Sequence, residues 1–424
     1  MANKTNIINI LEKYNFWDGS SIEFGYLRPS YLNKLENFLE SALVKVILGQ
    51  RRCGKSRLMR MMIHHLIYQH HVCAINILYI NKELHDFSFI TNAASLIETF
   101  QLYCETKQPK GKIYFFIDEV QDILDWEKAI NSLSQDYRLQ IELFITGSNA
   151  NLLSGELATH LSGRYLSIDV YPFSYEEYLH VFSLTRNKAS VLQYLDDGGL
   201  AELYQFNQTE SKQNYIQSLM DSIVLRDIVQ RHRIRDTFLL EKVIHFAIDS
   251  VGSMLSISSI IKTIARHGYH ANAETIGNYL DFCKNAFFLH ECERYDLRGK
   301  QILIGERKYY LNDLAFKTFH NSKFETHISR KLENAVYLSL RRQNYNVYVG
   351  RYDDKEVDFV AEKAGEKCYI QVAYLLADEK VVQREFSSLS LIQDNYPKWV
   401  VSLDDINHGN LQGILHKQLW DILT

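Results

Sequence analysis

Eight consecutive residues near position 50 have the types and the spacing of a phosphate-binding loop. They fit the pattern G-x-x-x-x-G-K-[ST] and read Gly49, Gln50, Arg51, Arg52, Cys53, Gly54, Lys55 and Ser56. In such a loop the glycines let backbone N–H groups point at phosphate oxygens, and the following helix adds the positive end of its dipole. Lys55 would then reach the β- and γ-phosphates, and the Ser56 hydroxyl would hold Mg²⁺. Together with Arg57, this segment is the candidate ATP-binding loop.

The residues on either side of this loop predict the elements that would position it. An apolar, β-branched segment at 43–48 precedes the loop, and apolar residues recur at helical spacing from Leu58 to Leu66. A strand, a glycine loop and a helix in this order form the context in which the pattern binds phosphate. The alternative is an ordinary glycine turn before a helix.

Two adjacent acids, Asp118 and Glu119, follow another apolar segment that begins at 113. Further apolar segments at 74–81 and 140–145, with an amphipathic stretch near 90–107, predict a parallel sheet that is buried on both faces. Asp118 would emerge at the carboxyl edge of that sheet and orient Mg²⁺. Glu119 would polarise a water molecule against the γ-phosphate. The alternative is that both acids cap the next helix.

Polar residues also follow the strand predicted at 140–145. The segment 146–149 ends in Ser148 and Asn149, and it would lie between the two strands that carry the loop and the acids. Arg164 stands in a glycine-containing turn, where its planar guanidinium could sense the γ-phosphate. A surface salt bridge explains Arg164 equally well.

These motifs, with Trp126 and the segment Pro172-Phe173-Ser174, resemble the AAA-type ATPases with a C-terminal DUF4143 region that are widespread in bacteria and archaea. The resemblance spans residues 28 to about 180, and the Arg51-Arg52 pair is also typical of these proteins. It implies an AAA core of the STAND-like kind. It further implies that Ser148 or Asn149 is a first sensor and that Arg164 is a second sensor or a finger.

The composition indicates an ordinary globular protein with several domains. The chain has 424 residues, of which 46% are hydrophobic and 23% charged, and this length favours two or three domains. The net charge of −4 gives no overall attraction to nucleic acid. Its six cysteines form no C-x-x-C pair, and no segment has the length and apolar character of a signal peptide or a spanning helix. We therefore expect a cytoplasmic protein without a membrane partner.

The middle part of the chain, 181–322, is predicted to be helical with a winged-helix order. Its first segment ends in a basic cluster between Arg226 and Arg235, for which a solvated helix face is favoured over a phosphate-binding stripe. Two helices near 256–261 and 272–280 and two strands follow, and a winged helix often binds DNA. The candidate recognition helix, however, sets Glu274 and Asp281 against only Lys284. Phosphate contacts supply most of the affinity for DNA, so a structural or protein-binding role is favoured.

The last part, 323–424, resembles the PD-(D/E)-x-K nuclease fold. Glu333 and Asp358 stand at two of the acidic positions, whereas Gln371 and Ala373 replace an acid and the lysine. A neutral amide is a poor Mg²⁺ ligand and alanine cannot assist a water molecule. We therefore expect no nuclease activity unless another acid or lysine, such as Glu356 or Lys367, takes the missing place.

Four histidines lie close together on the first predicted helix. They are His64, His65, His70 and His71, and that helix offers them no cysteine or acid partner for a metal site. The sequence alone therefore favours a surface face.

Together these features predict an α/β protein with three domains. A P-loop core at 1–180 would be followed by a helical and winged-helix region at 181–322 and a small restriction-endonuclease-like domain at 323–424. The predicted function is ATP binding with Mg²⁺ and slow hydrolysis that switches the arrangement of the C-terminal domains. The runner-up is a signalling or scaffold module that binds ATP or ADP without useful turnover and has an unidentified protein partner. A third possibility is a DNA-acting protein such as a nuclease or a defence component. The oligomeric state stays open.

Overall fold

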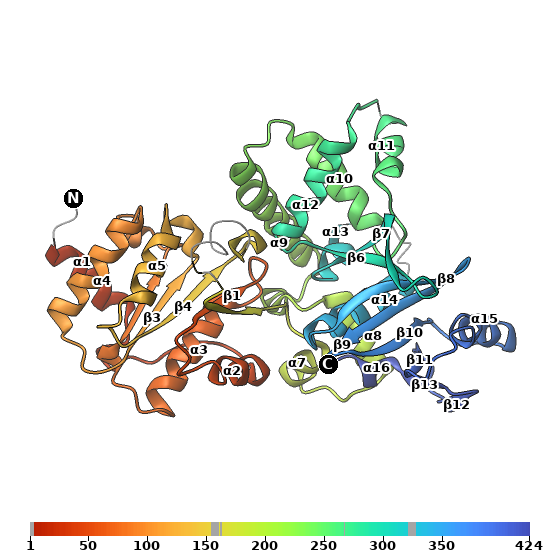
Figure 1. Ribbon diagram of the computed structural model, residues 1–424, viewed down its shortest axis with the longest axis horizontal. Helices are drawn as coiled ribbons and strands as arrows, with labels where there is room; N and C mark the ends of the chain where they lie inside the picture. Colours follow the sequence, from red (N-terminus) through yellow and green to blue (C-terminus); the bar gives the residue numbers. More distant parts are fainter. Residues whose placement is uncertain (1–3, 154–160, 162, 267, 321–327) are drawn as a thin grey trace. The chain divides into compact units, whose positions relative to one another are not determined.

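The computed structural model describes residues 4–153, 161, 163–266, 268–320 and 328–424. The chain divides into two compact units, Met1–Val170 and Tyr171–Thr424 (Figure 1). Residues 171–180, which we expected in the first domain, group with the second unit. The boundary that we expected at 322/323 lies outside the described residues, and the division of the second unit into two domains stays a prediction.

The first unit is built on a five-stranded parallel sheet with the strand order β2-β3-β4-β1-β5. Its strands are β1 (Val44–Leu48), β2 (Ile77–Asn81), β3 (Ile113–Asp118), β4 (Ile141–Gly147) and β5 (Tyr165–Asp169). The first four strands are almost entirely buried, as continuous apolar runs predict for a sheet that is covered on both faces. The strand that we expected at 74–81 begins only at Ile77, because residues 74–76 form a 3₁₀ turn.

Helices cover both faces of this sheet (Figure 1). They are α1 (Lys4–Tyr14), α2 (Pro29–Glu36), α3 (Lys55–Tyr68), α4 (Ala93–Lys107) and α5 (Trp126–Gln135). The figure shows α2 and α3 on one side and α4 and α5 on the other. The sequence of α5 explains how this helix packs against the rest of the unit. One stripe at helical spacing is buried, and it consists of Trp126, Ala129, Ile130 and Leu133. This parallel sheet with flanking helices is the P-loop NTPase fold, as predicted.

The second unit begins with a run of helices. They are α7 (Tyr175–Phe182), α8 (Lys188–Asp197), α9 (Thr209–Ser222), a π-helical segment (Ile223–Gln230), α10 (Thr237–Asp249), α11 (Ile257–Arg266), α12 (Ala273–Asn285) and α13 (Ala315–His320), and α14 (Ile328–Arg342), α15 (Glu379–Ser390) and α16 (Leu419–Ile422) follow later in the chain. Within the described part of the chain, no helix is both long enough and apolar enough to cross a membrane.

An eight-stranded mixed sheet joins the middle and last parts of the chain. Its strands are β6 (Leu289–Asp296), β7 (Gln301–Leu311), β8 (Asn346–Tyr352), β9 (Lys355–Lys363), β10 (Glu366–Val372), β11 (Lys398–Ser402), β12 (Asn410–Leu411) and β13 (Ile414–Gln418). The order is β12-β13-β11-β10-β9-β8-β6-β7. The hairpin β6–β7 therefore extends the sheet that begins with β8, through parallel pairing of β6 with β8.

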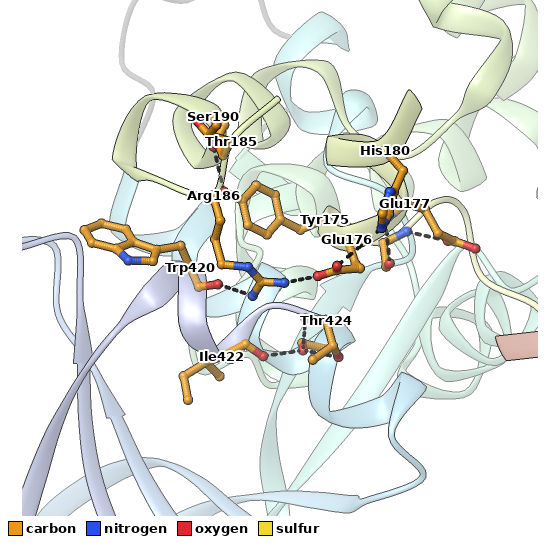
Figure 2. Close-up of polar contacts among 12 residues, drawn as sticks. Tyr175, Glu176, Glu177, His180, Thr185, Arg186, Ser190, Trp420, Ile422 and Thr424 are labelled. Carbon is orange, nitrogen blue, oxygen red and sulfur yellow. Dashed lines mark hydrogen bonds and ion pairs between the residues drawn. The ribbon is translucent and has the colours of Figure 1, made fainter. Parts of the chain in front are cut away.

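The end of the chain packs against the beginning of the second unit, as Figure 2 shows. The Arg186 guanidinium donates to the Trp420 carbonyl over 2.6 Å and also pairs with Glu176. The Ser339 hydroxyl donates to the Ile422 carbonyl over 2.9 Å. These contacts tie α7, α14 and the last residues together, so residues 171–186 belong structurally with the C-terminal part.

Candidate functional site

The glycines of the loop between β1 and α3 have backbone angles that other residues rarely adopt. Gly49 has φ 155° and Gly54 has φ 100°. A Cβ on Gly49 would lie 2.2 Å from the carbonyl oxygen of Val170, the residue that follows β5. The backbone of Val170 is thus too close to Gly49 for any residue with a side chain. Gly54 precedes Lys55 at the start of α3, where no side chain among the described residues caps the helix. The helix therefore presents its first N–H groups to the loop, which is the geometry that binds phosphate.

Lys55 lies in the centre of this loop. Its ammonium donates to the carbonyl oxygens of Gly49 over 3.0 Å and of Gln50 over 3.2 Å. The same nitrogen is 3.2 Å from Glu119 Oε1, and both side chains are almost completely buried. The structure thus brings together the lysine and one of the two acids that the sequence singled out.

Asp118 ends β3 and is completely buried. Its carboxylate accepts hydrogen bonds from the Thr146 hydroxyl over 2.5 Å and from the Tyr79 hydroxyl over 3.0 Å. Burial raises the pKa of Asp118, as does the neighbouring charge of Glu119, while hydrogen bonds from Ser56 and Thr146 oppose this rise. The Ser56 hydroxyl and the Asp118 carboxylate therefore lie together, and hard oxygen donors of this kind suit Mg²⁺.

Thr146 and Tyr79 also belong to the site. The sequence analysis included Thr146 in the polar segment 146–149 without a role of its own, and it missed Tyr79. Thr146 Oγ1 also accepts the Glu119 N–H over 2.9 Å, so one hydroxyl orients both acids. β4 lies between β3 and β1, as we predicted, and this order brings Thr146 beside β3. The signal for Thr146 was its place at the carboxyl end of a neighbouring strand. Tyr79 lies inside β2, and its sequence offered no such signal.

Glu119 stands in a left-handed turn directly after β3, with φ 56°. Its carboxylate accepts a hydrogen bond from the Gln121 amide and faces Lys55. Burial alone would raise the pKa of Glu119, but the charge of Lys55, the Gln121 hydrogen bond and Arg51 lower it to about 2. Glu119 is therefore ionised and engaged with the loop lysine. It does not act as a helix cap, because its side chain makes no cap hydrogen bond in the described turn.

Ser148 and Asn149 follow β4 at the same edge of the sheet, and both are fully buried. The Gln121 amide donates to Ser148 Oγ over 3.3 Å, which connects this segment to Glu119. Asn149 accepts the Asn151 N–H over 2.7 Å, but its side-chain Nδ2 has no hydrogen-bond partner among the described residues. A buried donor without a partner costs free energy, so a ligand oxygen at this position would be stabilising.

The remaining loop residues have different environments. Arg51 pairs with Glu83, Arg52 is exposed with φ 69°, and Gln50 and Cys53 are buried. Burial raises the pKa of the Cys53 thiol, so it is not a reactive thiolate.

Two further arginines border the loop. Arg57 is exposed and donates to the Glu23 carbonyl over 3.2 Å, so its predicted role at the nucleotide stays a prediction. Arg28, which we did not predict, is 3% exposed and donates to the Cys53 carbonyl over 3.1 Å. Arg28 therefore fixes the outside of the loop and begins the turn that leads into α2.

Arg164 lies at the opposite edge of the sheet from the loop. The Val44 N–H donates to the Arg164 carbonyl over 3.0 Å, and Val44 begins β1 whereas the loop follows its end at Leu48. Five residues of strand separate the two positions by roughly 15 Å. This distance does not favour a sensor role of Arg164 toward the loop of its own chain, and the role of Arg164 stays a prediction. The alternative salt bridge is also not found, because the exposed side chain makes no ion pair within the described part of the chain.

A cavity of about 510 Å³ lies at that same amino-terminal edge, away from the phosphate loop. Its lining includes Val44, Lys112 and Glu142, and Glu142 forms ion pairs with Lys45 and Lys112. The cavity is thus lined by the beginnings of strands, whereas the candidate site is formed by their ends.

In the second unit, Glu333 on α14 and Asp358 on β9 come together, as the nuclease-like pattern predicts. A lysine that we did not predict lies between them. Lys308 of β7 places its nitrogen 2.8 Å from Glu333, 2.7 Å from Glu356 and 3.7 Å from Asp358. Of the two substitutes that we considered, Glu356 joins this Lys308 cluster, whereas Lys367 instead donates to the Tyr295 hydroxyl over 3.2 Å.

The two replaced positions also differ from a metal site. The Gln371 amide donates to Glu385 over 3.2 Å, and Ala373 is buried just after β10. Burial and the charge of Glu333 raise the pKa of Asp358 to about 8, against the opposing effect of Lys308. Positive charge is therefore supplied to these acids by a side chain of the protein itself.

The predicted recognition helix corresponds to α12, which is followed by β6 and β7. Lys284 lies 2.7 Å from Asp281 and also pairs with Glu291, so its charge is compensated within the unit. Glu274 stays exposed in the first turn. The lysine of α12 is therefore balanced by acids of the same unit, and the structural or protein-binding role stays a prediction.

Comparison with known protein families identifies an AAA domain at residues 41–179. A domain of unknown function, DUF8612, matches residues 188–323. The DUF4143 region that the resemblance implied is not found, since the region in its place matches this different family.

Relatives match the chain over nearly its whole length. An uncharacterized protein of Haemophilus influenzae is 36% identical over 393 residues, which is 91% of this chain and 96% of that protein. The uncharacterized protein MJ1544 of Methanocaldococcus jannaschii is 29% identical, over 86% of this chain and 80% of that protein. Among solved structures, the Walker-type ATPase PABY2304 of Pyrococcus abyssi has a TM-score of 0.48 and 16% identity, over 70% of this chain and 95% of that one.

Proposed function

We propose that this chain, which belongs to the same family as the uncharacterized Haemophilus influenzae protein and carries an AAA domain, binds ATP with Mg²⁺ and hydrolyses it slowly as a nucleotide-driven switch. One observation carries the proposal. Lys55, Ser56, Asp118 and Glu119 meet at the carboxyl edge of the parallel sheet, beside the start of α3.

Each group of site residues would contact a different part of Mg²⁺-ATP. The N–H groups that begin α3 and the Lys55 ammonium would bind the β- and γ-phosphates. Ser56 and Asp118 would hold Mg²⁺, which neutralises charge on the phosphates during transfer. Asn149, whose buried Nδ2 has no partner among the described residues, would donate to a γ-phosphate oxygen. Asn149 is therefore a better sensor candidate than Ser148, whose hydroxyl already accepts from Gln121.

Glu119 is the proposed base, and its pairing with Lys55 supports slow turnover. A bound phosphate would compete for the Lys55 ammonium, which is 3.2 Å from Glu119. Losing this partner would raise the pKa of Glu119 from about 2 toward its ordinary range and let it orient water. Thr146 would keep the backbone of Glu119 in place through this change, because the hydrogen bond to its N–H does not involve the carboxylate.

The signalling module without turnover is the second candidate. It is supported by the same low pKa of Glu119, because a carboxylate that is so weakly basic is a poor base. Measured ATP turnover separates the two functions. Protein that binds ATP and releases no phosphate would support the second.

Glu119→Gln tests the catalytic role. The amide keeps the shape of the side chain and cannot accept a proton, and a general base typically contributes about 10²–10⁴-fold. We expect ATP affinity to stay near the wild-type value while phosphate release falls at least about a hundredfold. Glu105→Gln, an exposed acid on α4, is the matched control. Wild-type turnover in Glu119→Gln would contradict the assignment.

A further inference from the structure

Glu36, His65 and His70 form a compact cluster at the outer ends of α2 and α3, which we call the His–Glu cluster. The ligand atoms of the three side chains all lie within 4.8 Å of one another. Glu36 Oε1 is 3.2 Å from His65 Nε2 and 3.4 Å from His70 Nε2. The sequence offered no acid close to the histidines, because Glu36 stands on a different helix and is brought to them only by the packing of α2 on α3.

The backbone holds the two histidines in this arrangement. The N–H groups of Gln69 and His70 both donate to the His65 carbonyl, over 2.9 and 3.3 Å, where α3 ends. His71 then turns the chain with φ 54°. His70 is thereby folded back beside His65, with their ring centroids 5.1 Å apart. Glu36 is the last residue of α2, and Leu35 and Leu66 on the two helices lie in the same buried core. Figure 1 shows these two helices side by side.

The distances are those of metal ligands. Zinc is held at about 2.0–2.2 Å from histidine nitrogen and carboxylate oxygen, usually in a tetrahedron. Neighbouring ligand atoms of such a tetrahedron are separated by roughly 3.3–3.5 Å. The observed 3.2 and 3.4 Å are close to these values. Charge-assisted hydrogen bonds between nitrogen and oxygen are shorter, about 2.7–2.9 Å.

A second observation points to a ligand. His65 Nε2 is buried, and the Glu36 oxygen that it faces at 3.2 Å also lies 3.4 Å from His70 Nε2. The two ring nitrogens thus converge on one carboxylate oxygen, and a metal ion between the three side chains would bind each of them. The other members leave access to solvent, since the side chains of His70 and Glu36 are 39% and 41% exposed.

We propose that Glu36, His65 and His70 bind one Zn²⁺ ion, with water as the fourth ligand. Two imidazoles and one carboxylate are a donor set that zinc accepts. The other two histidines do not take part. His64 packs against the rings of Phe24 and Tyr68, with centroids 4.9 and 4.5 Å away, and His71 is exposed.

The position of the cluster keeps the zinc away from the nucleotide site. His65 and Lys55 stand on the same helix, and the rise of an α-helix places them about 15 Å apart along its axis. Zinc would therefore join the end of α2 to the end of α3 without contacting the nucleotide. The other end of α2 begins beside Arg28, which holds the loop through the Cys53 carbonyl. The site thus stabilises the helix pair that supports the loop.

Zinc titration of the metal-stripped full-length protein tests the proposal. Isothermal calorimetry should show one tight Zn²⁺ equivalent in the wild type. We expect His70→Ala to weaken it at least tenfold and Glu36→Gln to weaken it as well, whereas His71→Ala binds as the wild type does. His70 is exposed, so its replacement does not threaten the core.

Thermal unfolding gives a second readout that needs no nucleotide. Zn²⁺ should raise the melting temperature of the wild type and of His71→Ala, because a ligand that binds only the folded state stabilises it. It should not raise that of His70→Ala. Equal zinc affinity in His70→Ala and the wild type, or a wild type that binds no zinc, would overturn the proposal and leave the ATP-binding proposal untouched.

Discussion

Lys55 and Glu119 show at the scale of single residues how one ion pair can control a site. The two charged groups are 3.2 Å apart and almost fully buried, so neither is screened by solvent. Burial favours their neutral forms, yet each keeps the other ionised, and the pKa of Glu119 falls to about 2 as a result. A phosphate that takes over Lys55 would leave Glu119 free to act on water. Both binding and catalysis are therefore expected to depend on this lysine.

Lys55→Ala should strongly weaken the binding of Mg²⁺-ATP. The variant loses a buried, charged donor to the phosphates, and hydrogen bonds to charged groups contribute about 1.5–3 kcal/mol, which corresponds to a loss of more than tenfold in affinity. Calorimetric titration with a non-hydrolysable ATP analogue measures the affinity. Lys128→Ala, which removes a lysine that is 61% exposed on α5, is the control. Near-native affinity of Lys55→Ala would show that the loop does not bind phosphate as proposed.

Three elements of the second unit meet in the Lys308 cluster, and their contacts decide its chemistry. β7 supplies Lys308, α14 supplies Glu333, and β9 supplies Asp358 and Glu356. The Tyr310 hydroxyl also donates to Glu333, over 2.6 Å. Burial and the charge of Glu333 raise the pKa of Asp358 to about 8, although Lys308 opposes this rise. The cluster is therefore pH-sensitive.

The contribution of Asp358 to the stability of the second unit should fall as the pH rises from about 4 to about 8. Unfolded aspartate ionises near pH 3.9, whereas the pKa of folded Asp358 is raised to about 8. The folded state binds more protons in this window, so this group favours folding at low pH and loses that contribution as the pH rises, by at most about 1.4 kcal/mol per pH unit. Asp358→Asn should flatten the dependence, as followed by urea unfolding with tryptophan fluorescence at several pH values.

The exposed Asp354, two residues before Glu356 on the same hairpin, supplies the control for this experiment. Asp354→Asn should keep the wild-type slope. If Asp358→Asn and the wild type lose stability equally over the same pH range, Asp358 does not hold a proton in the folded protein.

At the scale of the whole molecule, the second unit places Lys308 among the acids Glu333, Glu356 and Asp358. We expect no cleavage of plasmid, single-stranded DNA or RNA by the purified protein with Mg²⁺ or Mn²⁺. Gln371 and Ala373 stand where the pattern has an acidic metal ligand and a lysine, so both groups are lacking. Lys308 already balances the negative charge of the remaining acids. Cleavage that vanishes in Asp358→Ala would contradict this prediction. If it also vanished in Lys308→Met, Lys308 would be the missing lysine.

Arg164 belongs to the same scale, because we predict that it acts on a second copy of the chain. We expect Arg164→Ala to lower ATP turnover with little loss of affinity, as removal of a finger does. Mixing Arg164→Ala with Lys55→Ala should then restore part of the turnover, since the second variant supplies Arg164 to the intact loop of the first. Full turnover of Arg164→Ala alone would exclude the finger role, and failure of the mixture would exclude action between copies.

The sequence by itself determined the phosphate loop, Asp118, Glu119 and the edge of the sheet where they meet. These features are local: a short spacing rule defines the loop, and apolar runs predict the strands whose ends carry the acids. Parallel pairing then places such ends together, so the neighbourhood of Lys55 and Asp118 could be predicted before any contact was known.

Only the tertiary structure decided which side chains from distant segments lie in these sites and which lie far from them. Thr146 and Tyr79 reach Asp118, Lys308 reaches Glu333, and Glu36 reaches His65 through strand pairing and helix packing. Arg164, which the spacing allowed near the phosphate, lies at the other end of β1 because β5 pairs in register with that strand. Such contacts depend on register and on which helix faces meet. A periodic pattern within a short segment encodes neither the strand register nor the helix faces that meet. Both arise from packing between residues that are far apart in the chain.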